Sequence, residues 1–141
     1  MYHKGDNNMK FFIFLTMIFL HIYDDFFTQS KSFVVDGKQK SWWEKNCPDK
    51  MYKNDYKVVL AVHGFSWAFV VHIPFIIMMY QSGRNDVWWL IGLSILGQSI
   101  IHSIIDDLKA NRHLINLFVD QYFHLVQITV IWTLFFKYIF V

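Results

Sequence analysis

The chain has 141 residues, of which 55% are hydrophobic, 20% aromatic and 17% charged, and its formal net charge is only +2. This length allows a single domain over residues 1–141, and the high apolar fraction indicates a membrane protein. The small net charge, with no basic stripe among exposed aromatic residues, excludes a nucleic-acid partner. Cys47 is the lone cysteine, which excludes an intrachain disulfide and a cysteine metal cluster.

Four long apolar runs dominate the sequence. Each is close to the ~20 residues that a helix needs to cross a bilayer, and a helix satisfies its own backbone hydrogen bonds in lipid. No run alternates polar and apolar residues, so a membrane β-barrel is not expected. The runs cover residues 11–29, 58–80, 87–108 and 114–138. Short connections join the last three, so the predicted fold class is all-α, an integral membrane four-helix up-down bundle.

The first run has some features of a secretory signal, because a basic residue precedes an apolar centre. No small-residue cleavage site follows, however, and His21, Asp24 and Asp25 occupy the place where one would lie. We therefore expect this run to remain in the protein as a transmembrane helix.

The connection between the first two runs, residues 30–57, is long and polar. The aromatic pair Trp42 and Trp43 suits an interfacial helix at headgroup level, and a flexible loop anchored by these rings is the alternative. Most Lys and Arg residues lie on this side of the predicted bundle, so the positive-inside rule places the connection in the cytoplasm. Abundant Phe, Ile, Lys and Asn beside little Ala suggest an AT-rich bacterial or phage genome, and hence the bacterial cytoplasmic membrane.

Ionisable pairs four residues apart interrupt three of the runs. The pairs are His21 with Asp25, His102 with Asp106, and Asp120 with His124. The first two pairs end their runs, whereas the third begins a run of opposite direction with its residue order reversed. The histidines should therefore share one depth, with the carboxylates about 6 Å nearer the long connection. His63, near the start of the second run, falls at the same level.

These buried polar groups have three competing explanations. They are a structural network of His–Asp hydrogen bonds, a proton or ion relay, and a metal centre. Imidazole and carboxylate are ligands of Zn, Mn and Fe, and a cation relieves carboxylates that cannot all stay ionised in a low-dielectric slab. We therefore predict one divalent ion or two. The predicted ligands are His21, Asp25, His63, His102, Asp106, Asp120 and His124.

Further polar residues adjoin the predicted ligands. Gln29 continues the first motif at helical spacing and Gln121 adjoins the last, so either could orient a ligand or substrate. Lys109 stands at the mouth of the site, where it would bind a phosphate or simply extend its ammonium group to the interface. Asp24 and Asp107 point about 100° away from the pairs and are expected at the interface or behind the ligands.

Four segments of the chain resemble a known family. HIYDDFFTQSKSF, VHGF, HSIIDDLK and DQYFHL are similar to motifs of small bacterial and phage integral membrane proteins of unknown function. The resemblance spans most of the chain and is weak over residues 30–57. It implies site residues at His21, Asp25, Gln29, His63, His102, Asp106, Lys109, Asp120, Gln121 and His124. A more distant similarity is to membrane-bound metal-dependent hydrolases, which also place His and Asp on bundle helices.

The sequence therefore predicts a metal-dependent hydrolase that acts at the membrane interface on a phosphate-bearing lipid or lipid-linked substrate. Asp25 or Asp106 would be the catalytic base. The alternatives are a non-enzymatic ion or proton conductor and a phage-encoded membrane interaction protein. Membrane lipid is the expected partner, with a homo-oligomer or a host membrane protein as others. The slab away from the site is almost wholly apolar, which disfavours a conductor.

Overall fold

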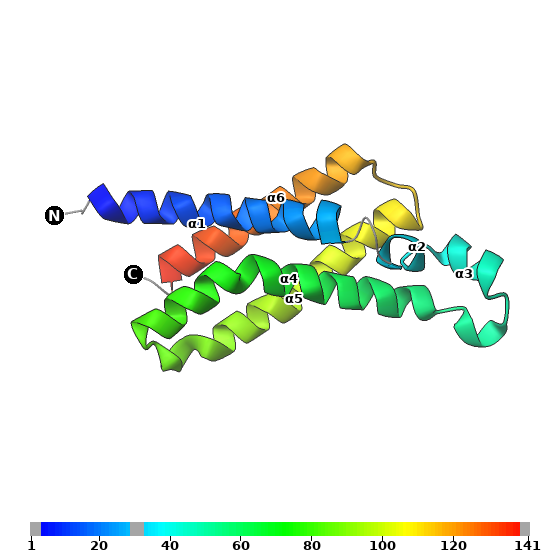
Figure 1. The fold of residues 1–141 in the computed structure, drawn as a ribbon, viewed down its shortest axis with the longest axis horizontal. Coiled ribbons are helices and arrows are strands. Elements are labelled where there is room, and N and C mark those ends of the chain that lie inside the picture. The colour runs from blue at the N-terminus through cyan, green and yellow to red at the C-terminus, as the bar shows by residue number, and fades with distance from the viewer. Residues whose placement is uncertain (1–3, 29–32, 139–141) are drawn as a thin grey trace.

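The computed structural model describes residues 4–28 and 33–138, and almost all of them lie in helices (Figure 1). The long helices are α1 (Lys4–Ile22), α4 (Asp55–Ser82), α5 (Trp88–Ala110) and α6 (Leu117–Tyr138). Shorter segments are the π-helix η1 (Tyr23–Thr28), the α-helices α2 (Val34–Gly37) and α3 (Lys40–Asn46), and the 3₁₀ turns η2 (Lys50–Tyr52) and η3 (Asn85–Val87). No strand occurs in these residues, so the predicted all-α class is confirmed.

The long helices follow the predicted apolar runs. α1 begins at Lys4 rather than at residue 11, because helical backbone continues beyond the apolar run. α4 passes through the buried Pro74 without ending, and it stops where Gly83 adopts a left-handed φ of 66°. That backbone conformation is open to glycine because it has no Cβ.

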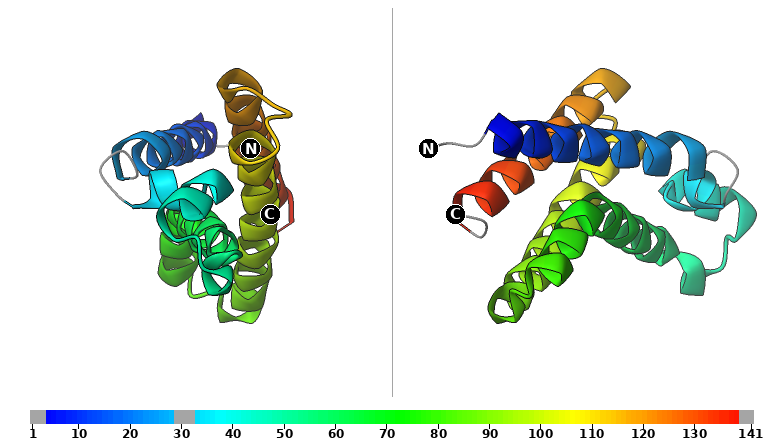
Figure 2. Two further views of the ribbon diagram at one scale, coloured as in Figure 1. Left: turned by 90° about the vertical axis from the view of Figure 1, so that its right-hand side faces the viewer. Right: turned by 60° about the vertical axis from the view of Figure 1, so that its left-hand side comes forward.

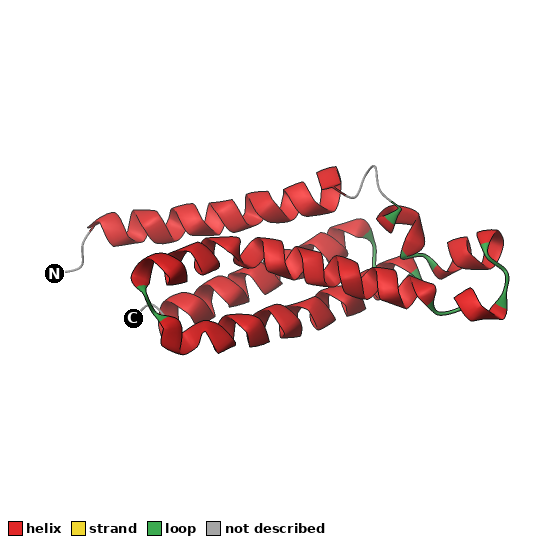
Figure 3. Cartoon of the chain, turned by 60° about the horizontal axis from the view of Figure 1, so that its bottom comes forward, coloured by secondary structure: helices red, strands yellow, loops and turns green. Residues whose placement is uncertain are grey.

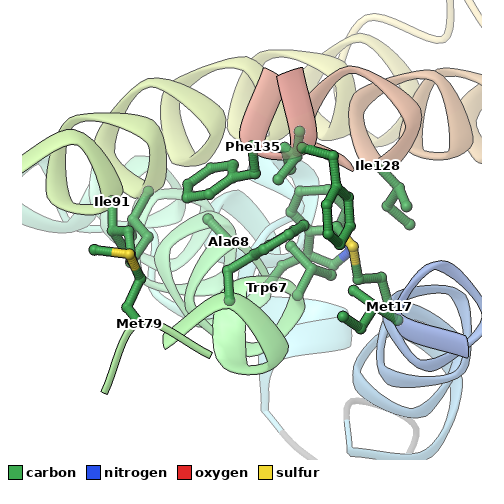
Figure 4. Close-up of a cluster of buried hydrophobic side chains, with 13 residues drawn as sticks. Met17, Trp67, Ala68, Met79, Ile91, Ile128 and Phe135 are labelled. Atoms are coloured by element: carbon green, nitrogen blue, oxygen red, sulfur yellow. The ribbon is translucent and has the colours of Figure 1, made fainter. Parts of the chain in front are cut away.

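The long helices pack as a ring in which α1 contacts α4 and α6, and α5 also contacts α4 and α6 (Figure 2). All four contribute to one buried apolar core, which Figure 4 shows around Met17, Trp67 and Phe135. Ile91 from α5 and Ile128 from α6 belong to the same core. The core fills the part of the molecule away from α2 and α3.

Three helical stretches are long and apolar enough to cross a membrane. They are Asn7–Thr28, Lys50–Ser82 and Trp88–Ala110. Large apolar side chains lie on their outer faces, for example Phe12 at 70% exposure and Ile100 at 62%. Such extensive apolar exposure is compatible with a membrane protein. Within the described residues α6 is not among these stretches, so its predicted crossing, and with it the four-helix membrane bundle, stays a prediction.

The long polar connection contains the two short helices α2 and α3, which pack on α4 beyond one end of the core (Figure 3). We call residues 33–46 the cap. Its backbone is fixed to the end of α5, because Asn111 donates from Nδ2 to the carbonyl of Lys38 (3.0 Å) and accepts from the Lys40 amide at Oδ1 (2.7 Å). Trp43 also donates from its indole to the carbonyl of Gly37 (2.7 Å). The cap therefore holds Lys38 in a defined place.

Helices α4 and α5 approach each other closely at Gly64. A Cβ added there would lie 2.3 Å from Ser103 Oγ and 2.6 Å from the carbonyl oxygen of Ser99, so Gly64→Ala would force the helices apart. We expect this substitution to lower the free energy of unfolding by about 1–3 kcal/mol, measured as a lower thermal midpoint in detergent. Gly92→Ala is the matched control, because a methyl group added there would meet nothing within 4 Å. Equal midpoints for the two variants would contradict the close approach.

Candidate metal centre

All seven predicted ligands lie in the described part of the chain, and the structure brings them together between the long helices. Six of the side chains are buried, with residue exposures of 3% or less, and the Asp25 side chain is 10% exposed. The set is His21 on α1, Asp25 on η1, His63 on α4, His102 and Asp106 on α5, and Asp120 and His124 on α6. Each long helix thus supplies a polar group to one layer above the apolar core.

Two groups of three residues could each hold a metal ion. Asp25, His63 and His102 form one, and His102, Asp106 and His124 form the other; in each, the ligand atoms lie within 4.8 Å of one another. The two groups share His102. Asp106 faces His63 Nε2 with Oδ2 (3.3 Å) and His124 Nε2 with Oδ1 (3.7 Å), so its carboxylate lies between the groups. Asp106 would therefore be available to a metal ion held by either group.

A stack of three rings fixes the histidines. Trp67 stacks on His102 with ring centroids 4.3 Å apart, and His102 stacks on His124 at 4.2 Å, with interplanar angles of 19° and 24°. The ring of Trp67 is wholly buried in the apolar core below. The core therefore sets the planes of the imidazoles and directs their edges toward the carboxylates.

His21 serves a different purpose in the structure. The Trp67 indole N–H is a donor only, and it lies 2.8 Å from His21 Nδ1, so Nδ1 accepts and the neutral ring carries its proton on Nε2. His21 Nε2 then donates to Gln121 Oε1 (3.0 Å). Both ring nitrogens are used, and His21 belongs to neither ligand group. Its role as a metal ligand stays a prediction, while the contacts make it the residue that orients Gln121.

Gln121 connects two carboxylates of the layer. Because its Oε1 accepts from His21, its Nε2 donates to Asp25 Oδ2 (3.3 Å) and to Asp120 Oδ2 (3.2 Å). The predicted ligand Asp120 therefore has one oxygen in hydrogen bonds and directs the other, Oδ1, toward His124 Nε2 at 3.4 Å. Gln121 sets the spacing of η1 and α6 at the site.

Two lysines close the layer on the side of the cap. Lys109, which the sequence predicts at the mouth of the site, lies 2.5 Å from Asp120 Oδ2 and forms an ion pair with this carboxylate of the layer. Lys38 lies 2.7 Å from Asp106 Oδ2, and its side chain is 12% exposed. Sequence reasoning missed Lys38, because it is separated from Asp106 by 68 positions and lies in a polar connection with many other lysines. Trp67 was missed too, although its position four residues after His63 on one helix face was a usable signal.

Asp24 lies behind His63 rather than at the membrane interface. Its Oδ2 is 4.0 Å from His63 Nδ1, while Oδ1 accepts from Ser66 (3.4 Å) and Thr28 (3.3 Å). Asp24 and Asp25 both turn inward because they lie in the π-helix η1, whose i→i+5 hydrogen bonds widen the turn. At 4.0 Å the carboxylate of Asp24 is too far from His63 Nδ1 for a hydrogen bond, so it adds negative charge behind the imidazole.

The layer carries more negative than positive formal charge. Its carboxylates belong to Asp24, Asp25, Asp106 and Asp120, and its ammonium groups to Lys38 and Lys109, which leaves a formal charge of −2 with neutral histidines. Among the described side chains, several buried atoms of the layer have no hydrogen-bond partner. They are Asp24 Oδ2, His102 Nδ1, Asp120 Oδ1 and His124 Nε2. Asp120 Oδ1 and His124 Nε2 face each other at 3.4 Å, and a carboxylate and an imidazole together in a layer of negative formal charge suit a divalent cation.

Two pockets reach the layer. The mouth pocket, of about 400 Å³, is lined by Asp25, Val35, Lys38, Gln39, Lys109, Ala110 and His113. The lateral pocket, of about 530 Å³, is lined by Ile18, His21, Ile22, Phe26, Phe27, Gln121 and Leu125. The mouth pocket lies under the cap, and the lateral pocket lies between α1, η1 and α6.

Of the other predicted polar residues, Gln29 lies outside the described residues. Asp107 faces away from the layer, where it pairs with Arg112 at 2.8 Å and accepts from Asn111 Nδ2 at 2.9 Å. His72 is buried deeper in the core and has a partner on each nitrogen, the carbonyl of Ala68 and the hydroxyl of Ser94.

The chain matches no family model, no curated protein and no solved structure. The resemblance to small bacterial and phage membrane proteins therefore stays a prediction, and the function has to be argued from the chemistry of the layer.

Replacing Trp67 by Phe tests the hydrogen bond that orients His21. Trp67→Phe keeps a ring over His102 and leaves His21 Nδ1 buried without its donor, so the free energy of unfolding should fall by about 1–3 kcal/mol. The measurement is the thermal midpoint in detergent. Trp89→Phe, at a site 62% exposed, is the control and should stay within about 0.5 kcal/mol of the wild type. An unchanged midpoint for Trp67→Phe would refute the importance of this bond.

Proposed function

We propose that the chain is an integral membrane protein with four spanning helices and an intramembrane His/Asp metal site. We further propose that it is a metal-dependent hydrolase acting at the membrane interface on a phosphate-bearing lipid or lipid-linked substrate. The observation that carries the proposal is the pair of ligand groups that share His102 and meet at the carboxylate of Asp106. Imidazole and carboxylate together suit Zn, Mn or Fe, and two adjoining groups suit one ion or a pair.

The residues around the layer support distinct roles in hydrolysis. A divalent ion supplies Lewis acidity and lowers the pKa of water toward neutrality. Asp25 is the better candidate for the catalytic base, because it lines the mouth pocket, whereas Asp106 is buried at 1% exposure and pairs with Lys38. Lys38 and Lys109 stand in the same pocket, where ammonium groups bind the oxygens of a phosphate.

The alternative function, a proton or ion conductor, needs polar residues along the whole length of the bundle. One turn below the layer, His124 Nδ1 contacts Gln127 Oε1 (3.3 Å), and Gln127 donates to Gln98 Oε1 (2.8 Å). Farther from the cap, the described core around Phe75 and Phe135 is apolar except for His72, whose two nitrogens are bonded to the carbonyl of Ala68 and the hydroxyl of Ser94. A site that opens toward the cap and is closed below by apolar side chains favours hydrolysis over conduction.

Metal content is the first test of the proposal. We expect the detergent-purified protein to carry about one or two divalent ions per chain, and the double variant His102→Ala, His124→Ala to carry almost none, because both ligand groups lose members. His72→Gln is the control, since His72 is a buried histidine outside the layer. Elemental analysis of the monodisperse protein gives the content.

The opposite result would be decisive as well. Equal, near-zero metal in the wild type and the double variant would contradict the metal site. The charge of the layer would then be offset by protonated histidines, which is the structural-network alternative.

Hydrolysis itself is tested by removing the proposed base. With the metal-loaded protein, Asp25→Asn should lower kcat for phosphate release from a phosphate-bearing lipid by about 10²–10⁴-fold, because the amide cannot accept a proton. Asp86→Asn, the same change at a side chain that is 64% exposed and far from the layer, should keep the wild-type rate. Metal content is measured on each sample, so that a lost ion is not mistaken for a lost base.

A metal-loaded wild type that releases no phosphate from either a monophosphate or a pyrophosphate lipid would contradict the hydrolase assignment. It would leave the metal site standing.

A further inference from the structure

We propose that the mouth pocket and the lateral pocket form one binding site for a membrane lipid with an anionic phosphate headgroup. The phosphate lies in the mouth pocket against Lys38 and Lys109, and an acyl chain lies in the lateral pocket between η1 and α6. This inference rests on the proposed metal site, and it adds where such a lipid enters and which side chains select it.

A lining residue of each pocket contacts a lining residue of the other. Asp25 lines the mouth pocket and Gln121 lines the lateral pocket, and Gln121 Nε2 lies 3.3 Å from Asp25 Oδ2. The boundary between the polar and the apolar part of the site is therefore also the edge of the metal-binding layer. In a lipid that fills both pockets, the link between the phosphate headgroup and the acyl chain would lie beside Asp25.

The lateral pocket is built for hydrocarbon. Ile22, Phe26 and Leu125 line it and are 42%, 45% and 41% exposed, while its polar members are His21 and Gln121. Its wall from α1 and η1 belongs to the stretch Asn7–Thr28, which is long and apolar enough to cross a membrane. In a bilayer this opening faces lipid chains, which are its natural occupant. Its volume of about 530 Å³ is within the usual range of ligand pockets.

The mouth pocket brings the ammonium groups of Lys38 and Lys109, which pair with Asp106 and Asp120, beside the carboxylate of Asp25. Lys38 and Lys109 line it together with His113, and Asn111 fixes the carbonyl of Lys38 and the amide of Lys40. The lysine is thus positioned by the cap rather than free to follow solvent. A first divalent ion would neutralise the formal charge of the layer and a second would make it positive, so metal loading strengthens the attraction for phosphate.

Lipid binding to the metal-loaded, detergent-purified protein tests this site. The probe is dioleoyl phosphatidate titrated in native mass spectrometry, with dioleoyl phosphatidylcholine and water-soluble glycerol 1-phosphate as comparison ligands. We expect phosphatidate to bind at least about 10-fold more tightly than either comparison ligand, because each lacks the exposed phosphate charge or the chain.

Two matched pairs of variants locate the lipid. Leu125→Trp fills the lateral pocket and should weaken phosphatidate binding at least about 10-fold. Leu134→Trp is the same change on the same helix, at 47% exposure and outside the pocket, and should bind as the wild type does. Lys38→Met should weaken binding about 10-fold, whereas Lys45→Met on the exposed face of α3 should not.

A second variant guards against misfolding. Ile22→Trp fills the lateral pocket from the opposite wall and should reproduce the effect of Leu125→Trp. Metal content and elution volume are measured on every sample. Wild-type binding by both pocket-filling variants would overturn the lipid site, as would equal affinity for glycerol 1-phosphate, which would indicate a soluble phosphate ester instead. Those results with metal still bound leave the metal site and the hydrolase assignment intact, whereas absence of metal from the wild type overturns the metal site and the lipid site together.

Discussion

The structure depends on one electrostatic constraint, the burial of four carboxylates in a layer where the lysines supply only two positive charges. Ionised groups removed from water are strongly destabilising unless they are paired, so the surrounding elements have to supply partners. The cap supplies Lys38 and the end of α5 supplies Lys109. The remaining charge and the unpartnered atoms of His102 and His124 make the layer a place for a cation.

The two sides of the layer are supported differently, by the apolar core on one side and by the cap on the other. Below it, the apolar core and the ring of Trp67 hold the histidine planes. Above it, the cap is short and is held through Asn111, Trp43 and the Lys38 ion pair. The mouth pocket lies on the side of the cap, and the apolar core lies on the other side of the layer.

Much of the layer follows from spacing in the sequence. His-x-x-x-Asp at the ends of two runs and Asp-x-x-x-His at the start of an oppositely directed one put the pairs at one depth, and the structure brings these residues together. Spacing could not divide them by role, because it gives depth and helix face but not the partner across the bundle. His21 shows this: its spacing matches that of His102, yet its nitrogens bond to Trp67 and Gln121.

The sequence by itself determined the all-α class, the positions of the long helices and the membrane-compatible character of three helical stretches, since each depends on local composition and on a 3.6-residue period. Tertiary structure alone decided that Lys38 enters the layer, that the π-helix turns Asp24 behind His63, and that Asp25 and Gln121, which line different pockets, contact each other. Those features arise from contacts between residues distant in the chain and from a local change of helix type. Neither leaves a periodic signal in the sequence.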